Sequence, residues 1–215
     1  MKKQIVIIDY QLSNLKSVEY ACQQVGLRPI VTSDPSVISQ AEALILPGVG
    51  AFGDAMKNLN QLQITPIIKQ KVKTGVPFLG VCLGLQLLFS HSEEFGLHPG
   101  LGILAGQVKR FPAADKQNTI IKVPQIAWNQ LASSQISWKQ TPFEHLEPGD
   151  FVYFVHSYYV TPDDPSITLS TTTYSGFNYC SSAKQNNVLA VQFHPEKSGT
   201  KGLQIYANWA KQNHL

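Results

Sequence analysis

A cysteine set between two glycines is the residue of this chain best placed to do chemistry. Cys82 follows an apolar run, residues 76–79, and precedes a second apolar run, residues 85–89, that is compatible with a helix. A nucleophile on a strained strand-to-helix turn is presented to substrate, and the unpaired N–H groups and dipole of the following helix favour its thiolate. Gly80 and Gly84 lack Cβ atoms, so the strand and the helix can approach each other closely. The pattern predicts a nucleophilic Cys82, against the alternative of a buried and unreactive cysteine.

A histidine and a glutamate near the carboxyl end supply the other groups that a cysteine nucleophile needs. His194 ends an apolar run, and Glu196 lies two residues further on. In an extended segment these two side chains lie on the same side, and Pro195 between them fixes φ. One imidazole nitrogen can then take the thiol proton while the carboxylate holds the other nitrogen. Alone, this tripeptide is typical of a charged loop; together with the cysteine turn it predicts a triad of Cys82, His194 and Glu196.

The elements that must position these groups alternate in the first half of the chain. Short apolar runs predict strands, and apolar residues at helical spacing predict helices. Strands are expected at residues 5–8, 29–32, 43–46 and 76–79, and helices at residues 14–25, after 34–35, and around 54–59 and 66–74. This alternation predicts an α/β fold with a mostly parallel, doubly wound sheet flanked by helices.

The second half has a different pattern, in which strands follow one another through polar loops. Strands are expected at residues 102–110, 125–131, 151–160, 167–173 and 188–193, followed by a final helix at 201–212. These add antiparallel strands to the fold. No repeat, low-complexity tract or linker divides the chain, so residues 1–215 are expected to form a single domain.

Composition narrows the class of protein further. The net charge of +3 comes without a dense basic block, which argues against a nucleic-acid partner. The longest nearly apolar stretch, residues 76–89, is too short to span a bilayer. Three cysteines without metal-ligand spacing favour a reducing compartment. We expect a soluble, cytoplasmic protein with no metal site and no membrane or nucleic-acid partner.

Five separated segments resemble the motifs of class I, triad-type glutamine amidotransferases in their order and spacing. They are residues 47–52, 80–86, 128–129, 154–158 and 192–198. Within that family, the pattern is most similar to the glutaminase subunits of imidazole glycerol phosphate synthases. The resemblance implies a flavodoxin-like domain that hydrolyses L-glutamine to glutamate and ammonia without a cofactor. It also implies a heterodimer with a (β/α)8-barrel cyclase subunit, which receives the ammonia through a sheltered channel and makes imidazole glycerol phosphate and AICAR in histidine biosynthesis.

The same resemblance implies roles for single residues. Cys82 attacks the side-chain amide of glutamine, His194 is the general base that then protonates the leaving ammonia, and Glu196 orients His194. The backbone N–H groups of Leu83 and Val49 stabilise the oxyanion. Further substrate contacts are implied for Gly48, Gly50, Gln86, His156, Ser157 and Tyr158. Contacts with the partner subunit near the ammonia exit are implied for Asn14, Trp128 and Lys197.

Simpler interpretations of three of these features remain open. Residues 47–50 are also compatible with a plain turn at the end of a strand. His156 is equally compatible with a packed histidine, and Trp128 with a core tryptophan.

Two segments depart from the usual family pattern. Residues 9–14 read Asp-Tyr-Gln-Leu-Ser-Asn in place of Asp-Tyr-Gly-x-Gly-Asn, and residues 124–129 read Pro-Gln-Ile-Ala-Trp-Asn in place of Pro-His-Met-Gly-Trp-Asn. Because Gln11 and Ser13 replace residues with free access to positive φ, we expect this loop to differ locally. Both departures fall on the side expected to face the partner, whereas the triad is intact.

These departures leave the ammonia acceptor open. Residues 92–98 also resemble duplicated copies of the subunit that are thought to serve surface-sugar amidation. A stand-alone cysteine hydrolase would share the cysteine turn and the histidine, but it has no use for a switchable oxyanion strip. A non-catalytic binding module on the same fold is disfavoured by the complete triad.

Overall fold

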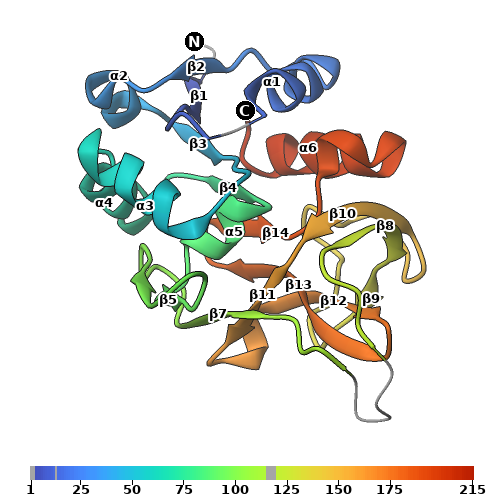
Figure 1. The fold of residues 1–215 in the computed structure, drawn as a ribbon. Coiled ribbons are helices and arrows are strands. Elements are labelled where there is room, and N and C mark those ends of the chain that lie inside the picture. Colours follow the sequence, from blue (N-terminus) through green and yellow to red (C-terminus); the bar gives the residue numbers. More distant parts are fainter. Residues whose placement is uncertain (1–2, 13, 115–119) are drawn as a thin grey trace.

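Five neighbouring parallel strands form one part of the main sheet, and the segments that carry the predicted triad follow them (Figure 1). The computed structural model describes residues 3–12, 14–114 and 120–215. The strands are neighbours in the order β2 (Ile30–Thr32), β1 (Ile5–Ile8), β3 (Ala43–Leu46), β4 (Phe78–Val81) and β14 (Val188–Val191). All residues of β1, β3, β4 and β14 are buried, as is typical of parallel strands that are covered on both faces. This is the strand order of the flavodoxin-like doubly wound fold, so the expected fold class is confirmed.

Helices cover both faces of these parallel strands. One face carries α1 (Leu15–Gln24) and α6 (Gly199–Gln212), and the other carries α2 (Pro35–Gln40), α3 (Phe52–Gln61) and α4 (Thr65–Lys73). Along β1, Ile5 and Ile7 pack into the first layer, and Val6 and Ile8 into the second. The alternation of side chains in a strand therefore divides the core into two layers, one on each face.

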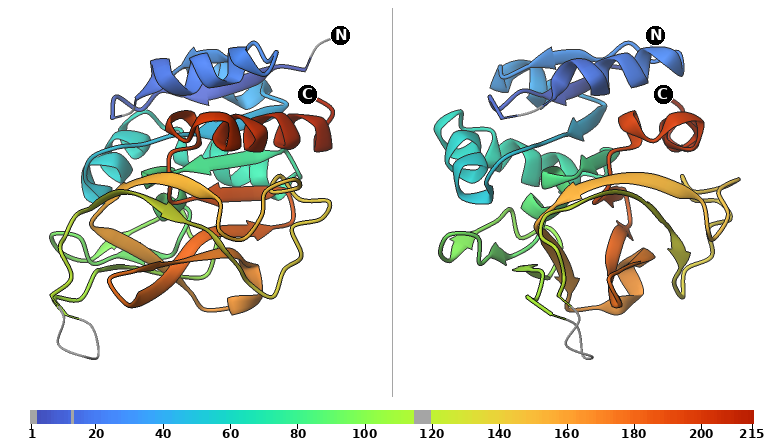
Figure 2. Two further views of the ribbon diagram at one scale, coloured as in Figure 1. Left: turned by 90° about the vertical axis from the view of Figure 1, so that its right-hand side faces the viewer. Right: turned by 45° about the vertical axis from the view of Figure 1, so that its right-hand side comes forward.

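The antiparallel part continues the same sheet beyond β14 (Figure 2). From β14 the order is β13 (Phe177–Gln185), β11 (Tyr158–Pro162), β7 (Gly106–Arg110), β5 (His91–Ser92) and β6 (His98–Pro99), and β12 (Thr168–Tyr174) pairs with both β13 and β9 (Ala132–Ser133). A short 3₁₀ helix, η1 (Pro165–Ile167), precedes β12. A separate ribbon of β8 (Gln125–Gln130) and β10 (Phe151–His156) packs against β13 through the rings of Phe154 and Tyr179.

Three expectations for this half need correction. The strand expected at 151–160 is two strands, because the chain leaves β8 at Ser157 and pairs with β7 instead. Only residues 106–110 of the run 102–110 are a strand. β13 was not anticipated, because its middle is made of small polar residues: Ser181 and Ser182 are buried and both hydrogen-bond the Ser170 hydroxyl, at 2.9 and 2.6 Å.

Within the described residues, the longest helices are too short and too polar to cross a membrane.

Candidate functional site

The predicted strand–turn–helix around Cys82 is present and strained. Cys82 stands between β4 and α5 (Leu83–Leu87) with φ 54° and ψ −109°, a conformation that L-residues rarely adopt. A Cβ on Gly84 would overlap the carbonyl oxygen of Leu46 in β3. A Cβ on Gly80 would lie 3.0 Å from the carbonyl oxygen of Gly84. The two glycines therefore let β3, β4 and α5 come together under the sulfur, and strain of this kind is typical of functional sites.

Three neighbouring strands end beside this sulfur. Residues 47–50 follow β3, Cys82 follows β4, and Gln192 to His194 follow β14. In open α/β sheets ligands bind outside the carboxyl ends of the strands. The topology thus brings together segments that lie more than a hundred residues apart in the sequence.

His194 and Glu196 form a buried pair. The Nδ1 atom of His194 lies 2.7 Å from Oε1 of Glu196, and the two side chains are 3% and 1% exposed. The backbone of His194 is held by Tyr153 of β10, whose carbonyl accepts the His194 N–H at 2.9 Å, and by the Ser198 hydroxyl, which donates to the His194 carbonyl at 2.6 Å. The expected extended geometry is wrong: Pro195–Lys197 is a 3₁₀ helix, η2, and its turn brings the carboxylate back to the ring.

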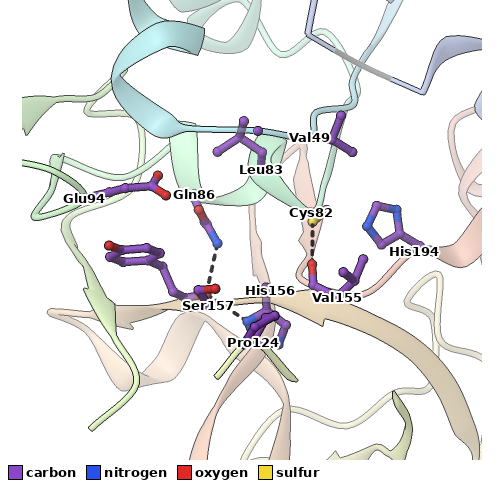
Figure 3. Close-up of a pocket in the computed structure, with 12 residues that line it drawn as sticks. Val49, Cys82, Leu83, Gln86, Glu94, Pro124, Val155, His156, Ser157 and His194 are labelled. Carbon is purple, nitrogen blue, oxygen red and sulfur yellow. Dashed lines mark hydrogen bonds between the residues drawn. The ribbon is translucent and has the colours of Figure 1, made fainter. Parts of the chain in front are cut away.

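The surroundings of His194 favour its charged form. Burial lowers the pKa of His194, but the neighbouring Cys82 sulfur and the Glu196 carboxylate together outweigh burial and raise the pKa to about 10. The other ring nitrogen, Nε2, is buried and has no hydrogen-bond partner among the described residues. It lies on the side of the ring that faces the pocket and Cys82 (Figure 3). This nitrogen is therefore available to exchange a proton with the sulfur or with a ligand.

A cavity of about 300 Å³ lies above the sulfur. Nine of the residues singled out from the sequence line it: Val49, Gly50, Cys82, Leu83, Gln86, His156, Ser157, Tyr158 and His194. Glu196 lies behind His194, and Gly48 lies behind Leu83, so neither lines the cavity. Sequence analysis missed three lining residues: Glu94, Pro124 and Val155.

Glu94 is the acidic residue of the cavity wall. Its Oε2 accepts the N–H of Phe52 at 2.7 Å, at the start of α3. Burial raises the pKa of this half-buried carboxyl, and the Phe52 hydrogen bond opposes the shift. In the sequence, only its position within residues 92–98 could have indicated Glu94, and that segment resembles duplicated copies of the subunit.

Gln86 is fixed at one end and free at the other. Its Nε2 donates to the Tyr158 carbonyl and to Oε1 of Gln192, both at 3.0 Å. The amide oxygen of Gln86 lies on the far side of the amide group from the nitrogen that contacts the Tyr158 carbonyl (Figure 3). It is thus left to accept a hydrogen bond from a ligand.

The two predicted oxyanion donors are both occupied by backbone carbonyls. The N–H of Leu83 donates to the Gly48 carbonyl at 3.4 Å, and the N–H of Val49 donates to the Leu12 carbonyl at 3.1 Å. Gly50 has φ +96°, which favours glycine, and a Cβ on Gly48 would overlap the Tyr10 hydroxyl. The strip of residues 47–50 is therefore more specialised than a plain turn, but in this conformation it does not present Val49 N–H to the cavity.

His156 is a packed, neutral histidine at the edge of the cavity. Nδ1 lies 2.8 Å from the Tyr158 carbonyl, which can only accept, so this nitrogen carries the proton. Nε2 lies 3.2 Å from the Tyr179 hydroxyl. Burial lowers the pKa of His156 to about 4. Its ring therefore shapes the wall and holds the Tyr158 carbonyl.

The residues implied at a subunit interface lie outside the cavity. Trp128 is 52% exposed, so it is not a core residue; its ring centroid is 6.1 Å from that of Tyr153. The Nζ atom of Lys197 lies 6.0 Å from the same Tyr153 ring. Asn14 precedes α1, and α1 packs against η2, which carries Lys197. We call Asn14, Trp128, Tyr153 and Lys197 the outer face.

The loop before α1 contains a left-handed residue that is not glycine. Gln11 has φ 71°, so a non-glycine residue takes the left-handed conformation here, and its N–H donates to Oδ1 of Asp9 at 2.9 Å. A positive φ is therefore present at this position without a glycine, and the expected local difference of the loop stays a prediction. Ser13 lies outside the described residues.

No group of three or more His, Cys, Asp or Glu side chains in the described part of the chain is placed to hold a metal ion.

Comparisons with known proteins agree over nearly the whole length. Residues 6–212 match the family described as glutamine amidotransferase class-I. The chain is 48% identical over 206 residues to the imidazole glycerol phosphate synthase subunit HisH of Syntrophotalea carbinolica. The aligned residues cover 95% of this chain and 98% of that protein. The chain is 49% identical over 208 residues to the subunit of the same name from Aquifex aeolicus, with 96% of each covered.

Solved structures share the fold at low sequence identity. A crystal structure of a glutamine amidotransferase superposes with a TM-score of 0.73 at 17% identity and covers 98% of this chain and 99% of that chain. The structure of PurLQS from Thermotoga maritima superposes with a TM-score of 0.69 at 18% identity and covers 98% of this chain and 99% of the matched chain. At these identities the likeness concerns the fold alone.

Proposed function

Because the chain belongs to the class I glutamine amidotransferase family, we propose that it hydrolyses L-glutamine and passes the ammonia to a partner subunit. The observation that carries the proposal is the meeting of Cys82, His194 and Glu196 beside one cavity at the ends of β4 and β14. The names of relatives at 48% and 49% identity support a finer assignment. In it, the chain is the glutaminase subunit of an imidazole glycerol phosphate synthase, and its partner is a (β/α)8-barrel cyclase.

The cavity offers complementary groups to both ends of glutamine. The Glu94 carboxylate and the free amide oxygen of Gln86 lie on one wall, where they suit the α-ammonium group. At the opposite end, the side-chain amide reaches Cys82 and His194. Ser157 and Tyr158 complete the wall between them. An amino acid held in this direction places its amide carbon over the sulfur.

Hydrolysis then follows in two stages. The Cys82 thiolate attacks the amide carbon, and the carbonyl electron pair moves to oxygen. His194 gives its Nε2 proton to the amide nitrogen, the C–N bond breaks, and ammonia leaves a thioester. A water molecule gives a proton to His194 and attacks the thioester carbon, which expels the thiolate and releases glutamate. Glu196 holds Nδ1 throughout and stabilises the imidazolium.

The oxyanion requires a change in the strip of residues 47–50. Leu83 N–H is occupied by the Gly48 carbonyl, and Val49 N–H by the Leu12 carbonyl. Rotation of the Gly48–Val49 peptide would free Leu83 N–H and turn Val49 N–H toward the sulfur, and the glycine on each side of Val49 makes such a rotation cheap. Leu12 lies two residues before Asn14, so a partner that binds the outer face is in a position to promote it.

The test is glutamate formation by the pure chain, with and without the ligand-loaded barrel subunit. We expect a low rate for the chain alone and a rise of roughly a hundredfold or more in the loaded complex, because one oxyanion donor is worth about that much. Cys82→Ala should abolish turnover in both states. A full rate for the isolated chain would refute the gating, and turnover by Cys82→Ala would refute the nucleophile.

The residues of β8 that depart from the usual family pattern support one alternative acceptor of the ammonia. Gln125 is buried where the family usually has histidine, and the adjoining Ile126 is 60% exposed on the ribbon that carries Trp128. A changed surface here suits a changed partner, such as a subunit that amidates a nucleotide-linked sugar. Glutamine-dependent product formation with each candidate partner distinguishes the two acceptors.

A further inference from the structure

Two buried glutamine amides connect the cavity wall with the Cys82 sulfur. Gln86 lies on α5 and is 5% exposed, and Gln192 follows β14 and is fully buried. The Nε2 of Gln86 donates to Oε1 of Gln192 at 3.0 Å, and the Nε2 of Gln192 donates to Sγ of Cys82 at 3.8 Å. Neither the triad nor the oxyanion strip uses this second contact.

A backbone carbonyl determines the direction of both amides. The Tyr158 carbonyl can only accept, so the Gln86 atom that lies 3.0 Å from it must be nitrogen. The same nitrogen faces Gln192, so the Gln192 atom beside it must be oxygen. The remaining end of Gln192 is then its NH₂ group. A donor, and not an acceptor, is therefore directed at the sulfur.

The donor matters because an acceptor lies on another side of the sulfur. The Val155 carbonyl oxygen is 3.9 Å from Sγ and suits a thiol that donates its proton (Figure 3). An oxygen in this place disfavours the thiolate, because Cys82 is only 6% exposed. Gln192 provides a fixed positive dipole end on the sulfur, whichever protonation state His194 has. Its backbone is fixed too, because its N–H donates to the Ser181 carbonyl at 2.9 Å.

The titratable groups around the sulfur come from four elements. His194 and, behind it, Glu196 belong to the segment after β14. His156 of β10 stays neutral because burial lowers its pKa to about 4. Tyr10, from the loop after β1, stays protonated because burial raises its pKa above the ordinary value. Glu94 lies across the cavity.

We propose that Gln192 is a further catalytic residue, whose side-chain amide stabilises the Cys82 thiolate, and that Gln86 positions it. The inference deepens the proposed glutaminase function and rests on it for the step in which the thiolate attacks. The amide pair also links the wall that would receive glutamine to the sulfur, because Gln86 takes part in both.

The test is the pH dependence of Cys82 alkylation by iodoacetamide, followed by mass spectrometry of the modified peptide. This reaction needs a thiolate but no glutamine, oxyanion strip or partner. In Gln192→Met, which keeps the length of the side chain and removes the donor, the midpoint should rise by about one pH unit, the scale of one hydrogen bond to a charged group. Gln125→Met, a change at an equally buried glutamine that does not touch the sulfur, is the matched control and should not move it. An unchanged midpoint in a folded Gln192→Met protein would overturn the proposal.

Two further measurements keep the test decisive if Gln192→Met does not fold. Gln86→Met should shift the midpoint in the same direction by a smaller amount, since it releases the Gln192 amide. In the unaltered protein, the NMR signals of the Gln192 side-chain amide should move over the pH range in which Cys82 becomes reactive. Signals that stay constant through that range contradict the proposal. A shifted midpoint in a chain that shows no glutaminase activity even with the ligand-loaded barrel subunit would instead sustain the thiolate contact and refute the proposed function.

Discussion

At the scale of single residues, the site combines two histidines with opposite environments. His194 lies between the Cys82 sulfur and the Glu196 carboxylate, and its pKa is raised to about 10. His156 is enclosed by rings and a carbonyl, and burial lowers its pKa to about 4. The first is suited to carry a proton during a reaction, and the second to remain neutral and hold the wall. The neighbouring Pro195 and Glu196 mark His194 in the sequence, whereas only the surroundings of His156 show that it is a packed residue.

The lowered pKa of His156 predicts a loss of stability in acid. The unfolded chain takes up a proton near pH 6.5, whereas the folded chain does so only near pH 4. The free energy of unfolding should therefore fall by up to about 3 kcal/mol as the pH decreases through this window, and flatten below it. Urea unfolding at several pH values measures the slope. In His156→Phe this part of the slope should vanish; an identical slope in the variant would assign the acid sensitivity to other groups.

At the scale of elements, the position of the sulfur depends on how closely β3, β4 and α5 approach. A Cβ on Gly84 would overlap the Leu46 carbonyl oxygen, and a Cβ on Gly80 would lie 3.0 Å from the Gly84 carbonyl oxygen. Backbone carbonyls, unlike side chains, cannot move aside without breaking the sheet. The short helix α5 is therefore fixed against β3 by the absence of a side chain.

Replacement of Gly84 tests this account of the turn. Gly84→Ala should destabilise the protein by more than about 2 kcal/mol, because a backbone shift is needed to relieve the overlap with Leu46. Gly102→Ala is a useful control, since it has positive φ (62°) but open space, and should cost only about 1–2 kcal/mol. Chemical denaturation of both variants gives the comparison. Equal losses would show that close packing at Gly84 is not limiting.

At the scale of the whole molecule, the reactive cavity lies near a surface that offers aromatic and basic groups. Tyr153 joins Trp128 to Lys197 on the outer face, and the backbone of Tyr153 holds His194. Exposed Ile126 and Phe151 lie on the same ribbon, β8 and β10. A large exposed aromatic group of this kind often dominates the affinity of an interface.

The outer face makes a prediction about association. Trp128→Ala should weaken binding to the barrel subunit by roughly tenfold or more, while thermal unfolding of the isolated chain changes little. Calorimetric titration of the two proteins measures the affinity. Ile30→Ala, at an exposed position of the opposite edge strand β2, is the control and should bind normally. Equal affinity for both variants would place the partner elsewhere.

The sequence by itself determined the family and the fold class, and it predicted the three groups of the proposed triad. Glycine spacing around Cys82, buried apolar strands and the His194–Glu196 pair are local patterns, and local patterns can be read without coordinates. The comparisons confirmed the family, and the strand order confirmed the fold class.

Only the tertiary structure decided the remaining features of the site and of the second half of the sheet, because these features depend on groups that are distant in the chain. The buried strand β13 and the break at Ser157 follow from pairing between strands, not from local propensity. The 3₁₀ turn at Pro195 brings the Glu196 carboxylate back to the His194 ring. The contact of Gln192 with Cys82 spans 110 residues and has a direction only because the Tyr158 carbonyl orients Gln86. Hydrogen bonds of this kind have no sequence pattern, since their partners meet only when the sheet has formed.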